Sequence, residues 1–267
     1  MTQTLALKLD VHPHPPASFP EGGSLSSVGK SLQILNSFRG SGVLLGVSQI
    51  AERAEVSKST AHRLLAVLVE HGFVEKRDGR YMLGRSIFEL GNLTADTRPR
   101  SLRENAMPFM VDLYKATDAT VHLAVLDGSD VLYIEKIYGH AAVPLPSRVG
   151  GRVPALCTAL GKALLAYTPP DERDSALANP VPRLTPYTVV DTRVLQDQIH
   201  HVRAHGYAVD QAGSSIAAQC FAAPILDSRS RAVAAVSMTI PVTSTVSTGA
   251  LRELMRAATG IGRTLTS

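Results

Sequence analysis

The sequence predicts a two-domain α+β protein in which a winged helix-turn-helix precedes a larger domain of hairpins and helices. Three patterns carry this prediction. Two short amphipathic helices separated by three residues are expected within 48–69, a charged hairpin follows at 73–83, and apolar runs of strand length alternate with helical patterns after residue 120. Strands in hairpins with helices packed on their faces are typical of α+β domains.

Composition and charge are those of a globular protein with one basic region. The 267 residues are 45% hydrophobic, which is enough for two modest domains with a core each. Residues 25–100 contain eleven Lys and Arg and seven Asp and Glu. Their surplus of positive charge therefore equals the formal net charge of the whole chain, +4. A basic surface concentrated in one domain favours nucleic acid as a partner.

The sequence shows neither a membrane segment nor a secretion signal. No apolar run approaches the length needed to span a bilayer, and the N-terminal MTQTLALKLD has no cleavage-site pattern. We therefore expect a cytoplasmic protein with no membrane partner, in which Cys157 and Cys220 are reduced thiols.

Residues 1–24 are expected to form a disordered tail, because 11–23 is rich in Pro and Gly and has no apolar period. The DNA-binding domain is expected over 25–84. Its first helix is predicted to be capped near Ser26 or Ser27 and to end at Gly40. The inward positions of this helix are Val28, Leu32, Ile34, Leu35 and Phe38.

The spacing of a helix-turn-helix is found between Ser48 and Val69. Ser48 opens a short helix, residues 55–57 form the turn, and the second helix has Ser57 as its predicted N-cap and Gly72 as its C-cap. The inward positions are Ile50, Ala51 and Ala54 on the first helix and Ala61, Leu64, Leu65, Leu68 and Val69 on the second. A helix that buries such a stripe can lay its polar N-terminal turns in a major groove.

A hairpin with a basic tip is predicted after the second helix. The charged turn 75–80 lies between the apolar runs 73–74 and 81–83, a position that suits the phosphate backbone beside the groove. The predicted DNA-binding residues are Ser48, Lys58, Ser59, Thr60, His62 and Arg63 on the helices and Lys76, Arg77 and Arg80 on the hairpin.

A linker helix is predicted over residues 85–100. Pro99 cannot continue a hydrogen-bonded helix interior, so a new helix is expected from about Pro99 to Thr117. The inward positions of the linker helix are Ile87, Phe88 and Leu90, and those of the next helix are Met107, Met110, Val111 and Leu113. The two apolar faces exceed what one small winged domain covers, so we expect a second subunit to cover the surplus.

Residues 101–267 are expected to form the second domain. A hairpin is predicted from 121–126 and 131–138, because two strand-like runs flank a turn at Asp127-Gly128. A further strand is expected at 143–149. Helices are predicted at 158–167, 192–205 and 248–264, and strands at 207–210, 218–226 and 232–240.

The runs SVGKSLQILNSF and SQIAERAEVSKSTAHRLLAVLVEHGFVEKRDGRYMLG, followed in order by LGKALLAY, HGYAVD, QCFAAPI and AAVSMTI, resemble the IclR family of bacterial transcriptional regulators. The resemblance covers about 26–262. It implies a winged helix-turn-helix, a linker helix that helps pair two subunits, and a GAF-like effector-binding domain. It also implies a non-enzymatic, ligand-responsive repressor that binds a near-palindromic double-stranded DNA operator as a homodimer or a dimer of dimers.

The resemblance also implies a pocket for a small organic effector, often a carboxylate. Matched motif by motif, its residues would be Ala159, Leu160, Asp210, Cys220, Ser237 and Thr239. Strand periodicity independently puts Ser237 and Thr239 on one face. Asp210 would repel an anion unless it is protonated or the effector also donates a hydrogen bond. The acidic residues that the family has after Asp210 are replaced by Gln211-Ala212, so the effector's identity stays open.

No cofactor or metal site is expected. Gly161-Lys162 lacks the remainder of a phosphate-binding loop, and neither the His12 and His14 pair nor the His201 and His205 pair has an evident third ligand. The alternative function is a thiol-based enzyme or redox sensor with a DNA-binding appendage. Its nucleophile would be Cys220 and its base His122, if the fold brings them together.

Overall fold

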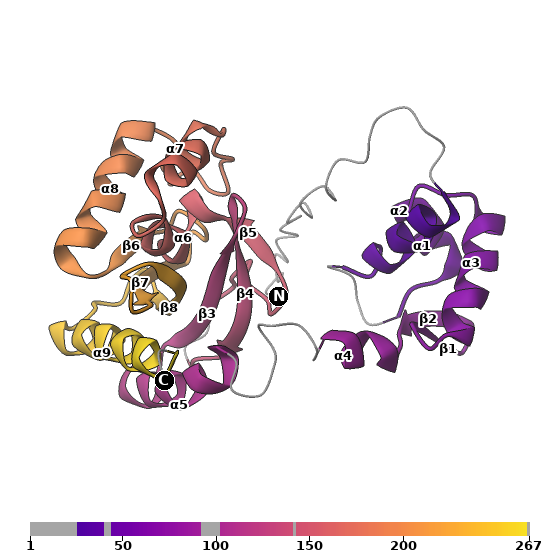
Figure 1. Ribbon diagram of the computed structural model, residues 1–267, viewed down its shortest axis with the longest axis horizontal. Coiled ribbons are helices and arrows are strands. Elements are labelled where there is room, and N and C mark those ends of the chain that lie inside the picture. The colour runs from indigo at the N-terminus through magenta and orange to yellow at the C-terminus, as the bar shows by residue number, and fades with distance from the viewer. Residues whose placement is uncertain (1–25, 40–43, 92–101, 141–142, 266–267) are drawn as a thin grey trace, which may run out of the picture. The chain divides into compact units, whose positions relative to one another are not determined.

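The chain divides into two compact units, residues 1–98 and 99–267. The computed structural model describes residues 26–39, 44–91, 102–140 and 143–265 (Figure 1). The expected tail and residues 92–100 of the expected linker helix lie outside these described residues, as does Gly40, the expected end of the first helix.

The first unit is a winged helix-turn-helix. Its elements are α1 (Ser27–Asn36), α2 (Val47–Arg53), α3 (Lys58–Glu70), β1 (Val74–Arg77), β2 (Arg80–Leu83) and α4 (Arg85–Gly91). Strands β1 and β2 form the antiparallel wing, and Leu45 bridges to Tyr81 beside it. Ile34, Ile50 and Leu65, from three different helices, are completely buried and form the centre of the core.

The predicted N-caps of α1 and α3 are confirmed, whereas α1 ends at Asn36, before its predicted end at Gly40. The Ser26 hydroxyl accepts a hydrogen bond from the Gly29 amide at 3.1 Å, and the Ser57 hydroxyl accepts one from the Thr60 amide at 3.2 Å. Gly72, with φ +73°, follows the last turn of α3 in the left-handed region that favours glycine. Helix α2 begins one residue earlier than predicted, at Val47.

Two predictions of inward-facing residues are wrong. Val28 and Leu32 of α1 are 70% and 47% exposed, and Phe88 and Leu90 of α4 are 73% and 52% exposed. None of the residues of α4 is buried. Periodicity marks an apolar face but not what covers it, and the small core of this unit is already closed by α1, α2, α3 and the wing.

The second unit is an antiparallel sheet with helices on both faces. Its elements are α5 (Leu102–Thr117), β3 (Thr120–Asp127), β4 (Asp130–Ile137), β5 (Arg152–Pro154), η2 (Ala155–Cys157), α6 (Ala159–Leu165), α7 (Pro170–Ala178), α8 (Thr192–His205), β6 (Ala208–Gln211), β7 (Ala218–Leu226), β8 (Ala232–Pro241) and α9 (Thr248–Leu265). The strand order is β5-β4-β3-β8-β7-β6.

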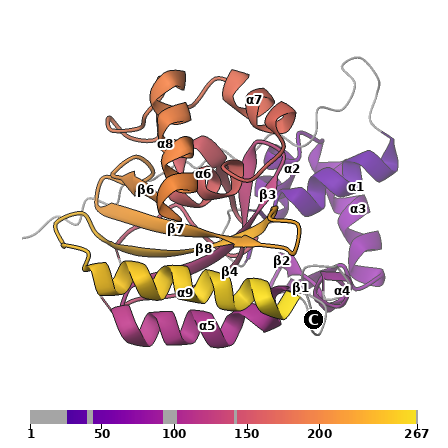
Figure 2. The same ribbon diagram turned by 60° about the vertical axis from the view of Figure 1, so that its left-hand side comes forward.

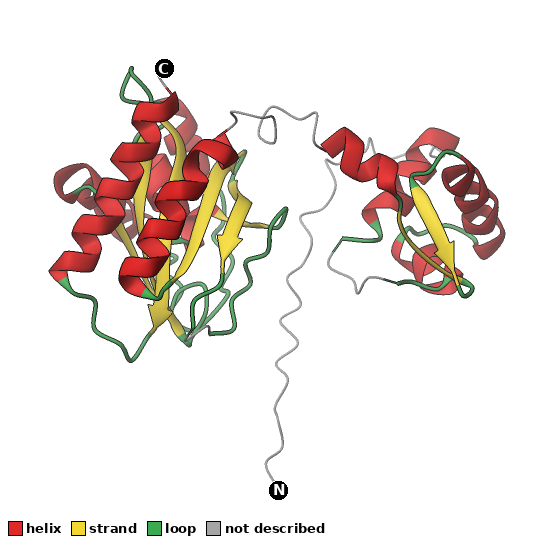
Figure 3. Ribbon diagram, turned by 90° about the horizontal axis from the view of Figure 1, so that it is seen from below, coloured by secondary structure: helices red, strands yellow, loops and turns green. Residues whose placement is uncertain are grey.

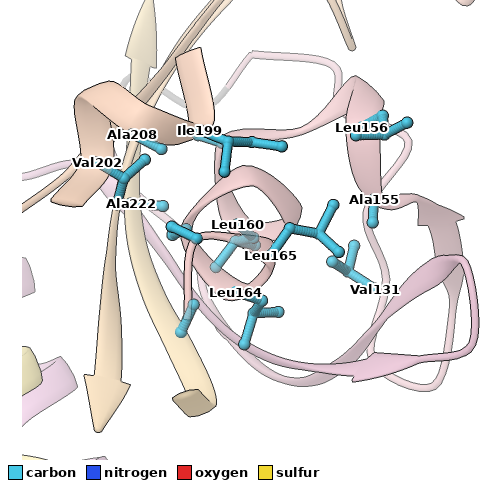
Figure 4. Close-up of a cluster of buried hydrophobic side chains, with 14 of the residues drawn as sticks. Val131, Ala155, Leu156, Leu160, Leu164, Leu165, Ile199, Val202, Ala208 and Ala222 are labelled. Carbon is cyan, nitrogen blue, oxygen red and sulfur yellow. The ribbon is translucent and has the colours of Figure 1, made fainter. Parts of the chain in front are cut away.

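The two faces of the sheet carry separate cores. Helices α5 and α9 lie side by side across one face (Figures 2 and 3). Helix α6 packs on the other face, with α8 outside it and α7 against α8. The buried side chains around α6 include Leu160, Leu164 and Leu165, and they share one cluster with Ile199 and Val202 of α8 (Figure 4).

Most predicted elements of this unit are confirmed, including the first hairpin, the three later strands, and the helices at 192–205 and 248–264. The strand expected at 143–149 is wrong. Pro144 and Pro146 have no N–H to give to a sheet, and β5 at 152–154 takes the edge position instead. Helix α7 was not predicted, because its sequence PDERDSALA has no clear apolar period.

Helix α5 does not offer the surplus apolar face that its sequence suggested. Met110 and Leu113 are 0% and 2% exposed, because the sheet and α9 cover them. Within the described residues, none of the helices is long and apolar enough to cross a membrane.

Candidate functional site

The exposed end of α3 carries most of the predicted DNA-binding residues. Its apolar stripe is buried, whereas the polar residues of its first turns face outward. The predicted residues that are exposed are Ser48, Lys58, Ser59, His62, Arg63, Lys76, Arg77 and Arg80. Thr60 is half-buried, and its hydroxyl oxygen accepts a hydrogen bond from the Ser57 hydroxyl at 2.8 Å. Thr60 therefore helps to cap the helix.

The wing next to α3 has cationic side chains that are only loosely held. The Arg77 guanidinium lies 3.2 Å from the Glu75 carboxylate, and the Lys76 ammonium lies 5.7 Å from the centroid of the Tyr81 ring. Exposed ion pairs contribute little to stability. Both cations can therefore leave these partners and contact a phosphate at little cost.

A second candidate site is a small cavity in the second unit, enclosed by the sheet, the start of α6 and the segment 145–147. Its lining residues are His122, Tyr133, Leu145, Pro146, Ser147, Thr158, Ala159, Leu160, Ser214, Cys220 and Thr239. The cavity has a volume of about 20 Å³, which is room for about one water molecule. An organic ligand therefore needs the covering segments to move outward.

The register of the sheet explains why the lining side chains meet. Asp210, Cys220 and Thr239 are direct neighbours on β6, β7 and β8. His122 on β3 is the direct neighbour of Ser237 on β8, two residues from Thr239. Residues two apart on a strand share a face, so both rows point towards α6.

The structure brings four of the six predicted effector residues to the cavity wall. Ala159, Leu160, Cys220 and Thr239 line it, with Thr158 capping the helix by accepting a hydrogen bond from the Gly161 amide at 2.9 Å. Asp210 and Ser237 do not line the cavity but contact residues that do.

Asp210 is held from two sides. Its Oδ2 accepts hydrogen bonds from the Ser214 amide at 3.0 Å and the Ser214 hydroxyl at 2.7 Å, and its Oδ1 lies 3.9 Å from the Lys162 ammonium. Burial lowers the pKa of Lys162, and the Asp210 carboxylate acts in the opposite direction. The charge of Asp210 is therefore compensated inside the protein, so a nearby anion meets less repulsion than the sequence alone suggested.

The cavity is neutral and poorly suited to thiol chemistry. Burial, and then the nearby Lys136, lowers the pKa of His122 to about 3, while burial raises the pKa of Cys220 to about 11. Burial also raises the pKa of Tyr133. His122 and Cys220 both line the cavity, but β8 lies between their strands, and a base this weak cannot deprotonate a thiol this weakly acidic. Cys157, the other thiol, is buried, and its pKa is raised to about 12.

Several lining residues were missed by sequence reasoning. The sequence suggested His122 only as a catalytic base. Its place in β3, opposite Ser237 of β8, makes it part of the cavity wall. Ser147 and Ser214 come from irregular segments whose positions depend on contacts far along the chain, such as the hydrogen bond from the Ser215 hydroxyl to the Pro144 carbonyl at 2.8 Å. Such contacts leave no local sequence signal.

No group of three or more His, Cys, Asp or Glu side chains is arranged to hold a metal ion among the described residues. The rings of His201 and His205 stack with centroids 3.8 Å apart, and His205 Nδ1 lies 3.0 Å from the His201 carbonyl. His12 and His14 lie outside the described residues.

Both units resemble known domains. Residues 27–78 match the IclR helix-turn-helix domain, and residues 95–263 match the domain described as "Bacterial transcriptional regulator IclR C-terminal". The chain is similar to the HTH-type transcriptional regulator XynR of Escherichia coli K12, with 32% identity over 248 residues that cover 90% of this chain and 97% of XynR.

Two solved structures are similar over nearly their whole length. An IclR homolog from Microbacterium hydrocarbonoxydans, complexed with 4-hydroxybenzoate, has a TM-score of 0.81 and 30% identity, covering 90% of this chain and 99% of the homolog. The Thermotoga maritima IclR has a TM-score of 0.76 and 32% identity, covering 90% of this chain and 99% of that protein.

The neutral state of His122 predicts a specific loss of stability in acid. Its pKa of about 3 lies below the ordinary value of 6.5, so the unfolded chain binds more protons at intermediate pH. This contribution is complete above about pH 6.5 and is lost as pH falls towards 3. Between pH 7 and pH 5 the expected cost is about 2 kcal/mol of unfolding free energy. Urea unfolding should show that His122→Gln flattens this pH dependence and that His200→Gln, at an exposed position, does not.

Proposed function

Since the chain belongs to the IclR family of bacterial transcriptional regulators, we propose that it is a cytoplasmic, dimeric repressor whose affinity for a near-palindromic operator is changed by a small hydroxylated carboxylic acid. Residues 25–84 bind DNA, 85–100 form the linker helix, and 101–267 bind the effector. Repression is assigned from the habit of the family.

The observation that carries the DNA-binding proposal is the outward polar end of α3 beside the cationic wing. Arg63 lies in the second turn of α3, where a guanidinium can read the edge of a base in the major groove. Lys76 and Arg77 lie on the wing, where they contact phosphates and position the helix. One such helix reads too few base pairs for useful selectivity, which supports two subunits on one operator.

The acid effector is supported by the donors around the cavity. The start of α6 at Ala159 and Leu160 supplies amide groups that have no partner within a helix. The Thr239 hydroxyl, which donates to the weak acceptor sulfur of Cys220, can turn to donate to a bound acid instead. Leu145, Pro146 and Leu160 provide apolar contacts for a hydrocarbon portion. The complex of a similar protein with 4-hydroxybenzoate supports a ligand of this chemistry. Asp210, fixed by Lys162, remains compatible with an anion.

The dimer is supported by the uncovered apolar face of α4. Phe88 and Leu90 are more than half exposed, and Ile87 is half-buried. Large apolar side chains grouped on one helix face are costly to leave in water. A second copy of the chain that presents the same face can cover them by twofold symmetry.

A regulator is favoured over the thiol-based enzyme or redox sensor because the cavity stabilises the unreactive form of its thiol. The Thr239 hydroxyl donates to Cys220 at 3.3 Å, yet burial outweighs this bond and keeps the pKa near 11. Thiolate is the nucleophilic and oxidisable form of cysteine.

The division of DNA contacts predicts different specificity effects. Arg63→Ala should weaken binding to the specific operator by about 1–3 kcal/mol and leave random DNA much less affected, because it removes a base contact. Lys76→Ala and Arg77→Ala should weaken both kinds of DNA alike and reduce the salt dependence. Fluorescence anisotropy with operator and scrambled duplexes measures both. Equal losses on the two duplexes for all three variants would contradict this assignment.

The α4 face predicts that one substitution dissociates the dimer. Phe88→Glu should give a monomer at micromolar concentration, because a charge replaces an apolar contact at the twofold interface. Operator affinity should fall with it. Val194→Glu, at an exposed position of α8, is the matched control and should remain dimeric. Light scattering measures the molecular mass of each variant in solution. A wild-type protein that is monomeric and binds DNA with one chain per site would exclude the dimer.

The cavity predicts that Thr239→Val weakens the acid without changing the fold. A hydrogen bond to a charged group contributes about 1.5–3 kcal/mol, so affinity should fall roughly 10- to 150-fold. Thr259→Val, on the exposed side of α9, should have no effect. The measurement is calorimetry of the full-length protein against hydroxylated aliphatic and aromatic acids. An acid that releases DNA yet binds Thr239→Val unchanged would place the effector elsewhere.

A further inference from the structure

Tyr133 reaches the cavity because β4 contains a β-bulge. His122 of β3 is paired with Lys136 of β4. Two residues further along β3, Ala124 is paired with Tyr133, so Ile134 is one extra residue in β4. Positions two apart on a strand share a face, and so do their direct partners. Tyr133 therefore lies on the α6 face and belongs to the buried cluster there, whereas Ile134 belongs to the cluster that includes α5 and α9.

The ring of Tyr133 is enclosed by the core, and its hydroxyl is open to the cavity. The residue is 6% exposed and lines the cavity, and its ring packs edgewise against the His122 ring with centroids 5.3 Å apart. The Tyr133 oxygen has no hydrogen-bond partner among the residues that the structure describes. In the same part of the chain, the unpaired side-chain atoms that are fully enclosed are Oε1 of Gln33 and of Gln198. The Tyr133 oxygen is unpaired but accessible, and the space that it borders is the cavity.

The other hydroxyls that line the cavity are already paired within the protein. Those of Ser147, Thr158, Ser214 and Thr239 are hydrogen-bonded, at 2.7 to 3.3 Å, to a lysine amine, a backbone carbonyl, a carboxylate and a thiol respectively. Tyr133 thus carries the one lining hydroxyl that lacks a partner in the described part of the chain. Burial raises the pKa of Tyr133, so the hydroxyl keeps its hydrogen and can donate it.

The small size of the cavity brings the Tyr133 hydroxyl near Thr239. A space of about 20 Å³ holds about one water molecule, so the groups that line it surround a single point. Tyr133 on β4 and Thr239 on β8 both reach this point from the sheet, with β3 between their strands. The Thr239 hydroxyl donates to a thiol, a weak acceptor that it can leave. A carboxylate has two oxygens and no hydrogen, so it can accept from both hydroxyls at once.

We propose that Tyr133 is an effector-binding residue, whose hydroxyl donates to one carboxylate oxygen of the acid while Thr239 donates to the other. This role rests on the proposed function, in which the cavity binds an acid. It places the carboxylate in the recess against the sheet. The hydrocarbon portion then extends towards Leu145 and Pro146, because the sheet and α6 close the other sides, and it displaces the segment that carries these two residues.

Two other roles of the Tyr133 hydroxyl lead to different results. A structural hydroxyl would stabilise the protein without any ligand. A hydroxyl that contacts the hydroxyl group of the effector would distinguish hydroxylated acids from acids that lack this group. Tyr133→Phe separates the three roles, because it removes one oxygen and keeps the ring that packs against His122.

The first test needs no ligand. Urea unfolding of the full-length protein should give the same midpoint for Tyr133→Phe as for the wild type, because no hydrogen bond within the protein is lost. Thr158→Val removes the hydroxyl that caps α6, so it should lower the midpoint. A midpoint of Tyr133→Phe as low as that of Thr158→Val would show that the hydroxyl supports the fold and would overturn the proposal.

The second test is calorimetry of the full-length protein with 4-hydroxybenzoate and benzoate, or with another hydroxylated acid of the panel and its counterpart without the hydroxyl. Tyr133→Phe should weaken both acids by the same factor, about tenfold or more, which is the loss of a hydrogen bond to a charged group. Tyr138→Phe, which is 67% exposed and follows β4, is the matched control and should bind both acids as the wild type does.

The remaining outcomes separate this proposal from the proposed function. A loss confined to the hydroxylated acid would overturn the contact between Tyr133 and the carboxylate. Equal affinities of the wild type and Tyr133→Phe for both acids would overturn the role of Tyr133 alone, because the protein would still bind an acid. A wild type that binds no acid of the panel would overturn the proposed function as well.

Discussion

Helix α6 has no exposed residue, and its position decides the geometry of the whole second unit. Its side chains fill the space between the sheet and α8, and Gly161 lies so close to the backbone of Ala155 that a Cβ would be 2.1 Å from the Ala155 carbonyl oxygen. Real Cβ contacts do not approach this closely, so the helix can pack here only with glycine at this position. Because the first residues of α6 also form a wall of the cavity, core packing and the candidate effector site are set by the same contact.

The buried polar side chains Asp210 and His122, next to the cavity, stay in the core because each is paired. An unpaired polar group in such surroundings costs about 1–3 kcal/mol. Asp210 is paired with Ser214 and Lys162, and His122 contacts Ser147 and Ser237. Two of these partners, Ser147 and Ser214, come from irregular segments over the cavity. A ligand that moves these segments therefore changes the pairing of the core, which gives a small molecule a way to alter the protein's conformational balance.

In the DNA-binding unit, one face of α3 builds the core and the other face is left for DNA. Its core is closed by three helices and the wing, and the energy of this core comes from the stripe of α3 that includes Leu64, Leu65 and Leu68. Burying that stripe leaves the other face of the same helix free for Arg63 and its neighbours. The apolar side chains of α4 contribute nothing to this core, so they are available for a partner. In the proposed dimer, regulation requires the effector to favour one arrangement of the two DNA-binding units, and typical coupling energies are about 1–3 kcal/mol.

Local pattern was enough to predict most elements of the chain, although it missed α7. Helix periodicity, the capping serines Ser26 and Ser57, and strand alternation all act within a few residues, so the sequence alone predicts both units and the outward polar end of α3. The strand expected at 143–149 is absent, because Pro144 and Pro146 have no amide N–H to give to a neighbouring strand.

Contacts between distant segments decided the rest. Sequence alone determined that apolar faces exist on α1, α4 and α5, but only the fold showed that α5 is covered by the sheet and α9 while α4 is not. Likewise, strand alternation put Ser237 and Thr239 on one face, but the register between β3, β4 and β8 joined His122 and Lys136 to them. Periodicity is a property of neighbouring residues, whereas register and coverage depend on which distant segments pair and pack, and no local pattern encodes that choice.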